Sequence, residues 1–355
     1  MVKNNIFELD KNDLDRSKEL HSKSIFVNML DATFLQHWDQ EYYDKLIKAG
    51  VTLDELDVEA YNFRQAVDVF NARISALSNI GMDKVIIARR TEDVYRAKKE
   101  GKIAFFFHTQ HGSIIENDLR LLETLHQMGL RVFGLCYSIR NHIADGCNEI
   151  TDAGLSAFGQ RVVKKCNELG IVIDLSHVGH QSSLEAIELS NDPTIFSHSN
   201  ANGVYRNRRN IDDDQIMAIG ENNGVIGIAS WGPMLKQLTS DEDQPTLKDM
   251  LDHLNYIVDM IGIDHVGIGV DVGWKRTKEE TEMDSNTLAF SAAELIPRSG
   301  PYIYGHHNWY VKELWDPEDW PLITDGLVAR GYSDDEILKI LGGNFMRVFK
   351  AVWDK

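Results

Sequence analysis

Residues 170–200 read GIVIDLSHVGHQSSLEAIELSNDPTIFSHSN and carry the strongest structural signal of the chain. Two short apolar runs, Ile171–Leu175 and Thr194–Phe196, are each followed by the dipeptide Ser-His. Between them lies an amphipathic segment, Gln181–Leu189, with the periodicity of a helix. The order strand, helix, strand is typical of a βαβ unit with two parallel strands.

The two Ser-His dipeptides place His177 and His198 directly after neighbouring strands. Functional residues of parallel α/β folds lie at the carboxyl ends of the strands, so both imidazoles are predicted to face the same opening. Imidazole is the commonest neutral metal ligand, and two on adjacent strand ends can converge on one ion. A strand cap or a loop hydrogen bond would explain one histidine, but two equivalent ones favour a metal or catalytic role.

Composition narrows the class of protein. The 355 residues include 37 Lys and Arg against 55 Asp and Glu, a net charge of −18. Such an acidic chain disfavours a nucleic acid or an anionic membrane as partner and fits a soluble protein with a small-molecule substrate. The polar amino terminus shows no signal peptide, and no apolar run is long enough to span a membrane. We expect Cys136, Cys147 and Cys166 to be reduced thiols in a cytoplasmic protein.

Apolar runs alternate with amphipathic segments along most of the chain, without a linker that divides it. This alternation predicts a closed (β/α)₈ TIM barrel, an α/β fold, as a single domain over residues 1–355. We expect an extension at about residues 1–22 and an irregular segment with helices at about 275–355. The run Lys84–Ala88 is not counted as a barrel strand. The eight predicted strands are Ser24–Leu30, Leu46–Val58 (weakened by its acidic residues), Ile103–Phe107, Arg131–Tyr137, Ile171–Leu175, Thr194–Phe196, Gly224–Trp231 and His265–Val270.

Polar and aromatic side chains follow several of these strands and are predicted to line one opening. They combine imidazoles, a carboxylate, an amide, a phenol and an indole, a composition typical of an active site. These residues are Gln110, Tyr137, His177, His198, Trp231 and Asp271.

The motifs, taken in order, resemble the membrane (renal) dipeptidase family, peptidase M19. The resemblance covers nearly the whole chain and is densest over Gly154–Val178, Pro193–Ala201, Arg208–Ile216, Gly224–Ile228, His265–Val272 and Gly326–Phe349. It implies a barrel of the amidohydrolase, metal-dependent hydrolase type, usually with two zinc ions at the carboxyl face of the strands. It also implies a homodimer.

The resemblance assigns roles to four residues. His177 and His198 match the two histidines that bind one zinc ion. Asp271 matches the aspartate of the last strand, which binds the other zinc and is a candidate proton shuttle. Arg209 matches the arginine that holds the substrate carboxylate, a role that suits the bidentate guanidinium group.

Other positions depart from the family pattern. Leu30 and Ala32 stand where the family has a metal-binding histidine and aspartate after the first strand. Gln110 replaces the glutamate that bridges the two ions, and Tyr137 replaces a histidine that polarises the substrate. The replaced ligands served the same metal, so the sequence indicates a divergent branch with one metal or none.

The remaining ligand set is His177, His198 and Asp271, sufficient for one divalent ion, zinc or another. We expect Asp271 to bind the metal or to act as a general base, and Gln110 to hydrogen-bond the attacking water or the substrate. Tyr137 is expected to donate to a developing oxyanion and to contact the substrate, and Trp231 to line the pocket.

Additional histidines leave alternatives open. His108 and His111 flank Gln110 and either could replace a lost ligand, against loop or solvent roles. Asp31 could replace the lost aspartate only through a register shift, because strand alternation turns it away. The pair His306-His307 could cover the opening, although an exposed loop explains it equally well.

Three functional hypotheses follow from these observations. The first is a metal-dependent hydrolase related to membrane dipeptidase that cleaves a small amide or a dipeptide-like carboxylate with a metal-activated water. The second is a hydrolase or lyase with a non-peptide substrate and one metal or none. The third is a non-catalytic small-molecule-binding relative, because fold does not fix function.

Overall fold

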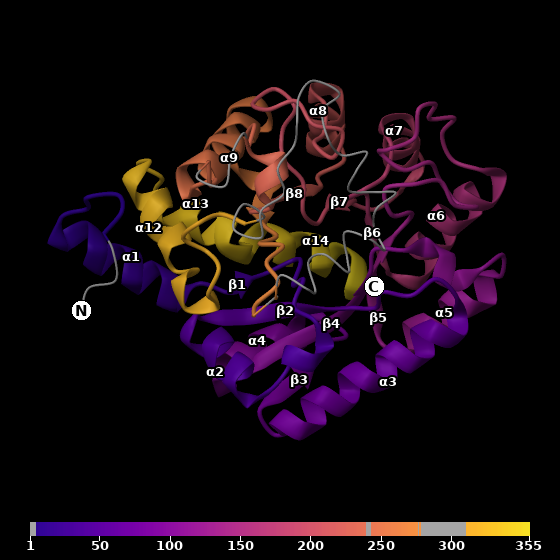
Figure 1. Ribbon diagram of the computed structural model, residues 1–355. Helices are drawn as coiled ribbons and strands as arrows, with labels where there is room; N and C mark the ends of the chain where they lie inside the picture. The colour runs from indigo at the N-terminus through magenta and orange to yellow at the C-terminus, as the bar shows by residue number, and fades with distance from the viewer. Residues whose placement is uncertain (1–4, 239–242, 276, 278–309) are drawn as a thin grey trace.

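A parallel β-barrel forms the centre of the computed structural model, which describes residues 5–238, 243–275, 277 and 310–355 (Figure 1). Its strands pair in the order β1-β2-β4-β5-β6-β7-β8-β9, and all pairs are parallel. The predicted (β/α)₈ barrel is confirmed. The strands are β1 (Phe26–Val27), β2 (Val51–Asp57), β4 (Ile103–Thr109), β5 (Leu130–Gly134), β6 (Val172–Asp174), β7 (Ile195–Phe196), β8 (Val225–Ile228) and β9 (Val266–Ile268).

The first and last strands close the barrel through the residues that follow them. Met29 N–H donates to the Ile268 carbonyl at 3.2 Å, and Asp271 N–H donates to the Leu30 carbonyl at 3.0 Å. A bridge between Asp31 and Val272 continues the same contact toward the carboxyl ends. Asp31 and Asp271 are therefore held on neighbouring strand ends.

The short strand β3 (Val85–Ile87) lies outside the barrel path and pairs only with β4, consistent with leaving Lys84–Ala88 out of the barrel. The second barrel strand is shorter than predicted and all seven of its residues are buried. Its acidic residues Asp54, Glu55 and Asp57 weakened the strand prediction, yet they lie within a strand that has neighbours on both sides. Each has a partner inside the barrel, Asn28 for Asp54, the Asp31 N–H for Glu55 and Gln110 for Asp57, although burial raises the pKa of all three.

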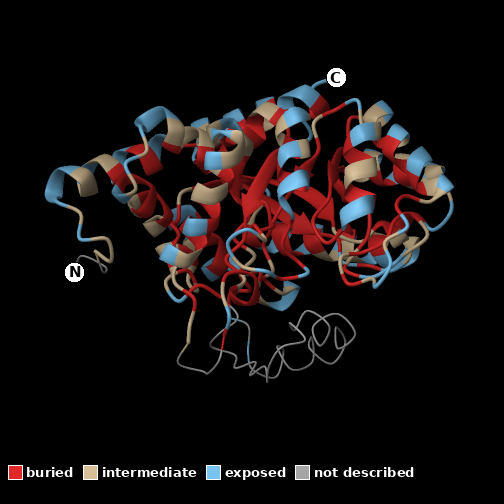
Figure 2. Ribbon diagram, turned by 90° about the horizontal axis from the view of Figure 1, so that it is seen from above, coloured by how far each residue is buried: buried red, intermediate tan, exposed pale blue. Residues whose placement is uncertain are grey.

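Helices surround the barrel and turn their exposed faces outward (Figure 2). Helix α7 follows the predicted segment Gln181–Leu189 closely. Side-chain caps such as Asn62 before α3 and Ser156 before α6 fix where helices begin. The surrounding helices are α2 (Gln40–Lys48), α3 (Phe63–Ile80), α4 (Thr91–Glu100), α5 (Leu119–Met128), α6 (Ala157–Leu169), α7 (His180–Leu189), α8 (Asp213–Glu221) and α9 (Leu247–Ile261).

The last helix of the chain packs beneath the barrel, at the amino ends of its strands (Figure 1). Helix α14 (Asn344–Trp353) buries Phe345, Phe349 and Trp353 in the same cluster as Phe106 of β4. It follows α12 (Leu322–Ala329), α13 (Asp334–Leu338) and a wide turn at Lys339–Gly343, where Gly342 leaves the helical conformation as the Gly-Gly dipeptide predicts. A Cβ at Gly342 would lie 2.0 Å from the Ile25 carbonyl, so this close approach requires glycine.

Helix α1 (Lys11–Lys23) forms the predicted amino-terminal extension and packs on α12, where Ser17 Oγ donates to Asp325 Oδ1 at 2.5 Å. The pair His306-His307 lies outside the described residues. Among the residues that the structure describes, no helix is long and apolar enough to cross a membrane.

Candidate active site

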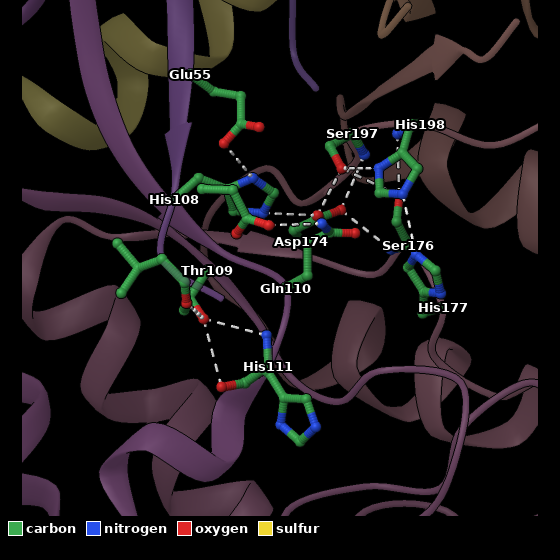
Figure 3. A network of polar contacts seen from close by, with 12 residues as sticks. Glu55, His108, Thr109, Gln110, His111, Asp174, Ser176, His177, Ser197 and His198 are labelled. Atoms are coloured by element: carbon green, nitrogen blue, oxygen red, sulfur yellow. Dashed lines mark hydrogen bonds and ion pairs between the residues drawn. The ribbon is translucent and has the colours of Figure 1, made fainter. Parts of the chain in front are cut away.

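A histidine pair, His177 and His198, forms the centre of the candidate site. The Nε2 atoms of the two rings lie 3.0 Å apart, and both side chains are almost fully buried (Figure 3). Each Nδ1 atom is next to a serine hydroxyl: Ser138 Oγ at 2.8 Å from His177 and Ser197 Oγ at 2.7 Å from His198. Burial, reinforced by the Arg209 charge, holds the pKa of both histidines well below the ordinary value. Both rings are therefore neutral at pH 7.

Local backbone geometry places these side chains at the opening. His177 (φ 71°) and Asp271 (φ 55°) both adopt the left-handed conformation, which costs a non-glycine residue about 1 kcal/mol or more. Close packing supports His198, because a Cβ at Gly227 or Gly269 would lie 2.0 or 2.1 Å from the Ser197 carbonyl. The chain of β8 and the residue after β9 can approach this segment only because Gly227 and Gly269 have no side chain.

Arg209 lies directly beside the histidine pair. Its Nη2 donates to the His198 carbonyl at 2.8 Å and its Nη1 to Ser199 Oγ at 2.9 Å, with the side chain 3% exposed. Both acceptors are neutral, and neither of these two contacts within the described part of the chain is to a carboxylate. By contrast, Arg208 donates to the Asn148 carbonyl, away from this pair of contacts. A buried guanidinium bound to neutral oxygens is suited to an anionic ligand.

Tyr137 stacks on the His177 ring, with centroids 4.0 Å apart and an interplanar angle of 22°. Burial, together with the charges of Glu59 and Asp271, raises the pKa of the phenol above its ordinary value. The hydroxyl group therefore keeps its proton at neutral pH and can donate it in a hydrogen bond. His111 lies parallel to Tyr137 on the other side at 6.3 Å, and burial lowers the pKa of His111 to about 4.

Asp271 follows β9 in the left-handed conformation, and its charge acts to raise the pKa of both Tyr137 and Arg209. Trp231 follows β8 and its backbone forms a bridge with Tyr310, with the side chain only partly buried. The structure thus brings His177, His198, Arg209 and Tyr137 together. Asp271 and Trp231 each lie just after the end of a strand, β9 and β8.

Gln110 follows β4 and donates from Nε2 to Asp57 Oδ2 at 3.0 Å. Burial and the charge of Glu55 raise the pKa of Asp57 to about 6. Leu30 is buried, and Asp31 accepts hydrogen bonds from Tyr42 Oη at 2.5 Å and from Thr33 N–H at 2.9 Å. Asp31 is therefore engaged with neighbouring donors.

A second polar cluster, the charge network of Glu55, His108 and Asp174, was not identified from the sequence. His108 Nε2 lies 3.0 Å from Asp174 Oδ2, and its Nδ1 lies 3.4 Å from Glu55 Oε2, an ion-pair distance without hydrogen-bond alignment (Figure 3). Burial would lower the pKa of His108, but the bonds and charges of Asp174 and Glu55 raise it to about 10. His108 is thus a cation with both nitrogens facing carboxylates, not a metal ligand. The acidic run in β2 was the signal that could have revealed it.

The histidine pair has the features of two metal ligands. The Nε2 atoms of the histidine pair converge, both rings are neutral, and each Nδ1 has a hydroxyl partner, which is how metal-binding histidines are held. Within residues 5–238, 243–275, 277 and 310–355, no group of three or more His, Cys, Asp or Glu side chains is arranged to hold an ion. The described site therefore fits two metal ligands, and Asp271 as a third stays a prediction.

The fold and the neutral histidine pair at the carboxyl face define an amidohydrolase-type (β/α)₈ barrel. The family model described as membrane dipeptidase (peptidase family M19) matches residues 28–300 and 304–354. The chain belongs to this family.

Relatives agree with this assignment. The chain is 27% identical over 274 residues to dipeptidase tcpJ of Claviceps purpurea, a match that covers 77% of this chain and 56% of that protein. This chain thus spans about half the length of that curated relative. An amidohydrolase from Pseudomonas aeruginosa superposes with a TM-score of 0.84 at 27% identity, covering 96% of this chain and 99% of that one.

A metallopeptidase from Rhodobacter sphaeroides, liganded with a phosphinate mimic of the dipeptide L-Ala-D-Ala, superposes with a TM-score of 0.75. The alignment is 20% identical and covers 93% of this chain and 100% of that one. At this identity the likeness supports the fold.

Proposed function

We propose that this protein is a metal-dependent hydrolase that cleaves an amide bond in a small carboxylate-bearing substrate of the dipeptide type. The observation that carries the proposal is the convergence of two neutral imidazoles, 3.0 Å apart at Nε2, beside the buried guanidinium of Arg209. Family membership and the relatives named dipeptidase or amidohydrolase support the reaction class.

Some residues of the proposed site bind the substrate, and others donate or accept protons. Arg209 pairs with the substrate carboxylate and thereby places the amide bond over the histidine pair. Tyr137, whose phenol keeps its proton, donates to the oxygen that becomes negative during attack. Asp271 acts either as a metal ligand or as the base that accepts a proton from the attacking water, and Gln110 orients that water or the substrate.

The metal ion of this proposal would be held by His177 and His198, with Asp271 as its third ligand. When bound, a divalent ion such as zinc supplies a water of lowered pKa and a Lewis acid for the carbonyl. We propose one ion per chain, because Gln110, in the place of a bridging carboxylate, brings a neutral amide that donates to Asp57. Leu30 and Ala32 carry no ligand atoms in their side chains.

Metal content is the first test. Inductively coupled plasma mass spectrometry on protein purified without chelator or nickel should find about one divalent ion per chain. His177→Ala and His198→Ala should each lose the ion and the hydrolysis of dipeptides. His180→Ala is the control, since His180 binds Asp214 on the surface. An unchanged metal content in both site variants would overturn the proposed ligands.

The carboxylate requirement is the second test. Wild-type protein should hydrolyse a dipeptide in preference to its carboxyl-terminal amide, and Arg209→Met should remove that preference by lowering kcat/KM for the free acid about 10- to 100-fold, the value of a charge-assisted pair. Arg208→Met, matched in chemistry and adjacent in sequence, should retain the preference. Inhibition by a phosphinate dipeptide mimic should follow the same pattern, and equal loss in both variants would argue against the assignment of Arg209.

A further inference from the structure

A continuous line of polar contacts crosses the barrel interior from β2 to the histidine pair. It begins with the charge network, Glu55, His108 and Asp174, and continues through Ser197 to His198 (Figure 3). Ser197 Oγ donates to Asp174 Oδ2 at 2.6 Å and lies 2.7 Å from His198 Nδ1. All five side chains are at most 1% exposed, so water does not interrupt the line.

Asp174 has four donors and therefore acts as an anion. Its Oδ1 accepts from Ser176 N–H at 3.0 Å and Ser197 N–H at 2.8 Å, and its Oδ2 faces His108 Nε2 and Ser197 Oγ. Burial alone would raise the pKa of Asp174, but the hydrogen bond and charge of His108 lower it below the ordinary value. An ionised carboxylate has no proton to give, so every contact of Asp174 requires a proton from its partner.

This requirement determines the protonation of His198. The single hydroxyl proton of Ser197 goes to Asp174, because a carboxylate at 2.6 Å is a stronger acceptor than the Ser176 hydroxyl at 3.2 Å. Ser197 Oγ can then only accept from His198, so the ring proton of the neutral imidazole is on Nδ1. The Nε2 atom of His198 is left unprotonated and directed at His177 Nε2.

We propose that His108, held between Glu55 and Asp174, is a positioning residue that keeps the proton of His198 on Nδ1 and leaves Nε2 available to a metal ion or to a proton. His108 does not touch the opening and acts only through Asp174 and Ser197. The inference uses the proposed function in one respect, that His198 is a site residue. This positioning role belongs to buried residues, and the hydrolase reaction by itself does not require it.

The test is the tautomer of His198, read by nitrogen NMR on protein labelled with ¹⁵N-histidine. Spectra are recorded on the purified protein and again after dialysis against a chelator, and His198 is assigned by its loss in His198→Ala. In wild-type protein His198 should carry its proton on Nδ1 in both samples. A proton on Nε2 in the dialysed wild-type protein would overturn the proposal without any variant.

His108→Leu removes the cation beside Asp174. The buried carboxylate then takes up a proton and donates it to Ser197, Ser197 donates to His198 Nδ1, and the ring proton moves to Nε2. The dialysed variant should show this exchange, and its dissociation constant for Zn²⁺ should rise about 10- to 100-fold, as for other residues that orient a metal-binding histidine. A folded variant with wild-type tautomer and Zn²⁺ affinity would mean that the network only fills the barrel.

Two further variants keep the test decisive. Glu55→Gln retains the shape of the side chain and should also shift the His198 ring proton toward Nε2. It replaces His108→Leu in the test if that variant does not fold. His21→Leu is the matched control, because His21 is also buried and bonded at both nitrogens, to Thr324 and Ala49. It should leave His198 unchanged. The tautomer is measured without substrate, so failure of dipeptide hydrolysis and failure of this proposal are separate outcomes.

Discussion

The charge network and the histidine pair are neighbours inside one barrel, and both contain fully or almost fully buried histidines. His108 faces two carboxylates and is a cation, with a pKa raised to about 10. His177 and His198 face serine hydroxyls, each other and Arg209, and both are neutral. Burial is common to all three rings, so the charges of the neighbouring side chains decide the protonation state.

The difference separates residues that position the site from residues that can bind a ligand. The network satisfies its charges internally, and a satisfied buried ion pair is sensitive to removal of any member. The histidine pair keeps two nitrogens directed at one point and an arginine bound to neutral oxygens, so it retains capacity for ligands. Variants in each region should therefore have different effects: loss of stability in the network and loss of activity around the pair.

Asp174→Ala should have the largest effect. It leaves the His108 cation with a single carboxylate and removes the acceptor for Ser197 and for two backbone N–H groups. We expect the free energy of unfolding to fall by about 3–5 kcal/mol. Ser138→Ala, which removes one hydroxyl beside His177, should cost only about 1 kcal/mol. Chemical denaturation measures both, and equal costs would remove the distinction between the two regions.

Tyr137→Phe should lower activity at nearly unchanged stability. The phenol stacks on His177 and keeps its proton, so its loss removes one donor to the developing oxyanion. We expect kcat for a dipeptide to fall about 100-fold, with KM and metal content retained. The control is Tyr61→Phe, an exposed tyrosine that contacts the edge of His111. A rise in KM without a change in kcat would assign Tyr137 to binding alone.

The sequence predicted the barrel and the histidine pair because both leave local signals. Apolar runs alternate with helical segments, and each Ser-His dipeptide follows its own strand. It did not predict the charge network, because Glu55, His108 and Asp174 are on three strands, and only closure of the barrel brings them together. The acids of β2 instead weakened the strand prediction, since burial of carboxylates is unfavourable until their partners are known.

Gln110→Glu tests whether a carboxylate at this position is enough to create a site for a second metal ion. The new carboxylate would lie beside Asp57, whose pKa is already raised to about 6, and Leu30 and Ala32 would still supply no ligand. We expect no second ion per chain and a stability loss of about 1–2 kcal/mol at pH 8, the cost of two neighbouring anions. Two ions per chain in this variant would show that other residues supply the missing ligands, and its neutral control is Gln110→Asn.

A slope of stability with pH reports the charge of His108 directly. A pKa raised from 6.5 to about 10 means that the folded chain holds a proton that the unfolded chain releases above pH 6.5. The stability contributed by His108 is therefore complete below pH 6.5 and is lost as pH rises toward 10. Between pH 7.5 and 9 this one group should lower the free energy of unfolding by up to about 1.4 kcal/mol per pH unit. His108→Gln should lack that component, whereas His21→Gln, which replaces a histidine of lowered pKa, should retain it. Parallel curves for wild type and His108→Gln would mean that His108 is neutral, and the contrast between the charge network and the histidine pair would then rest on geometry alone.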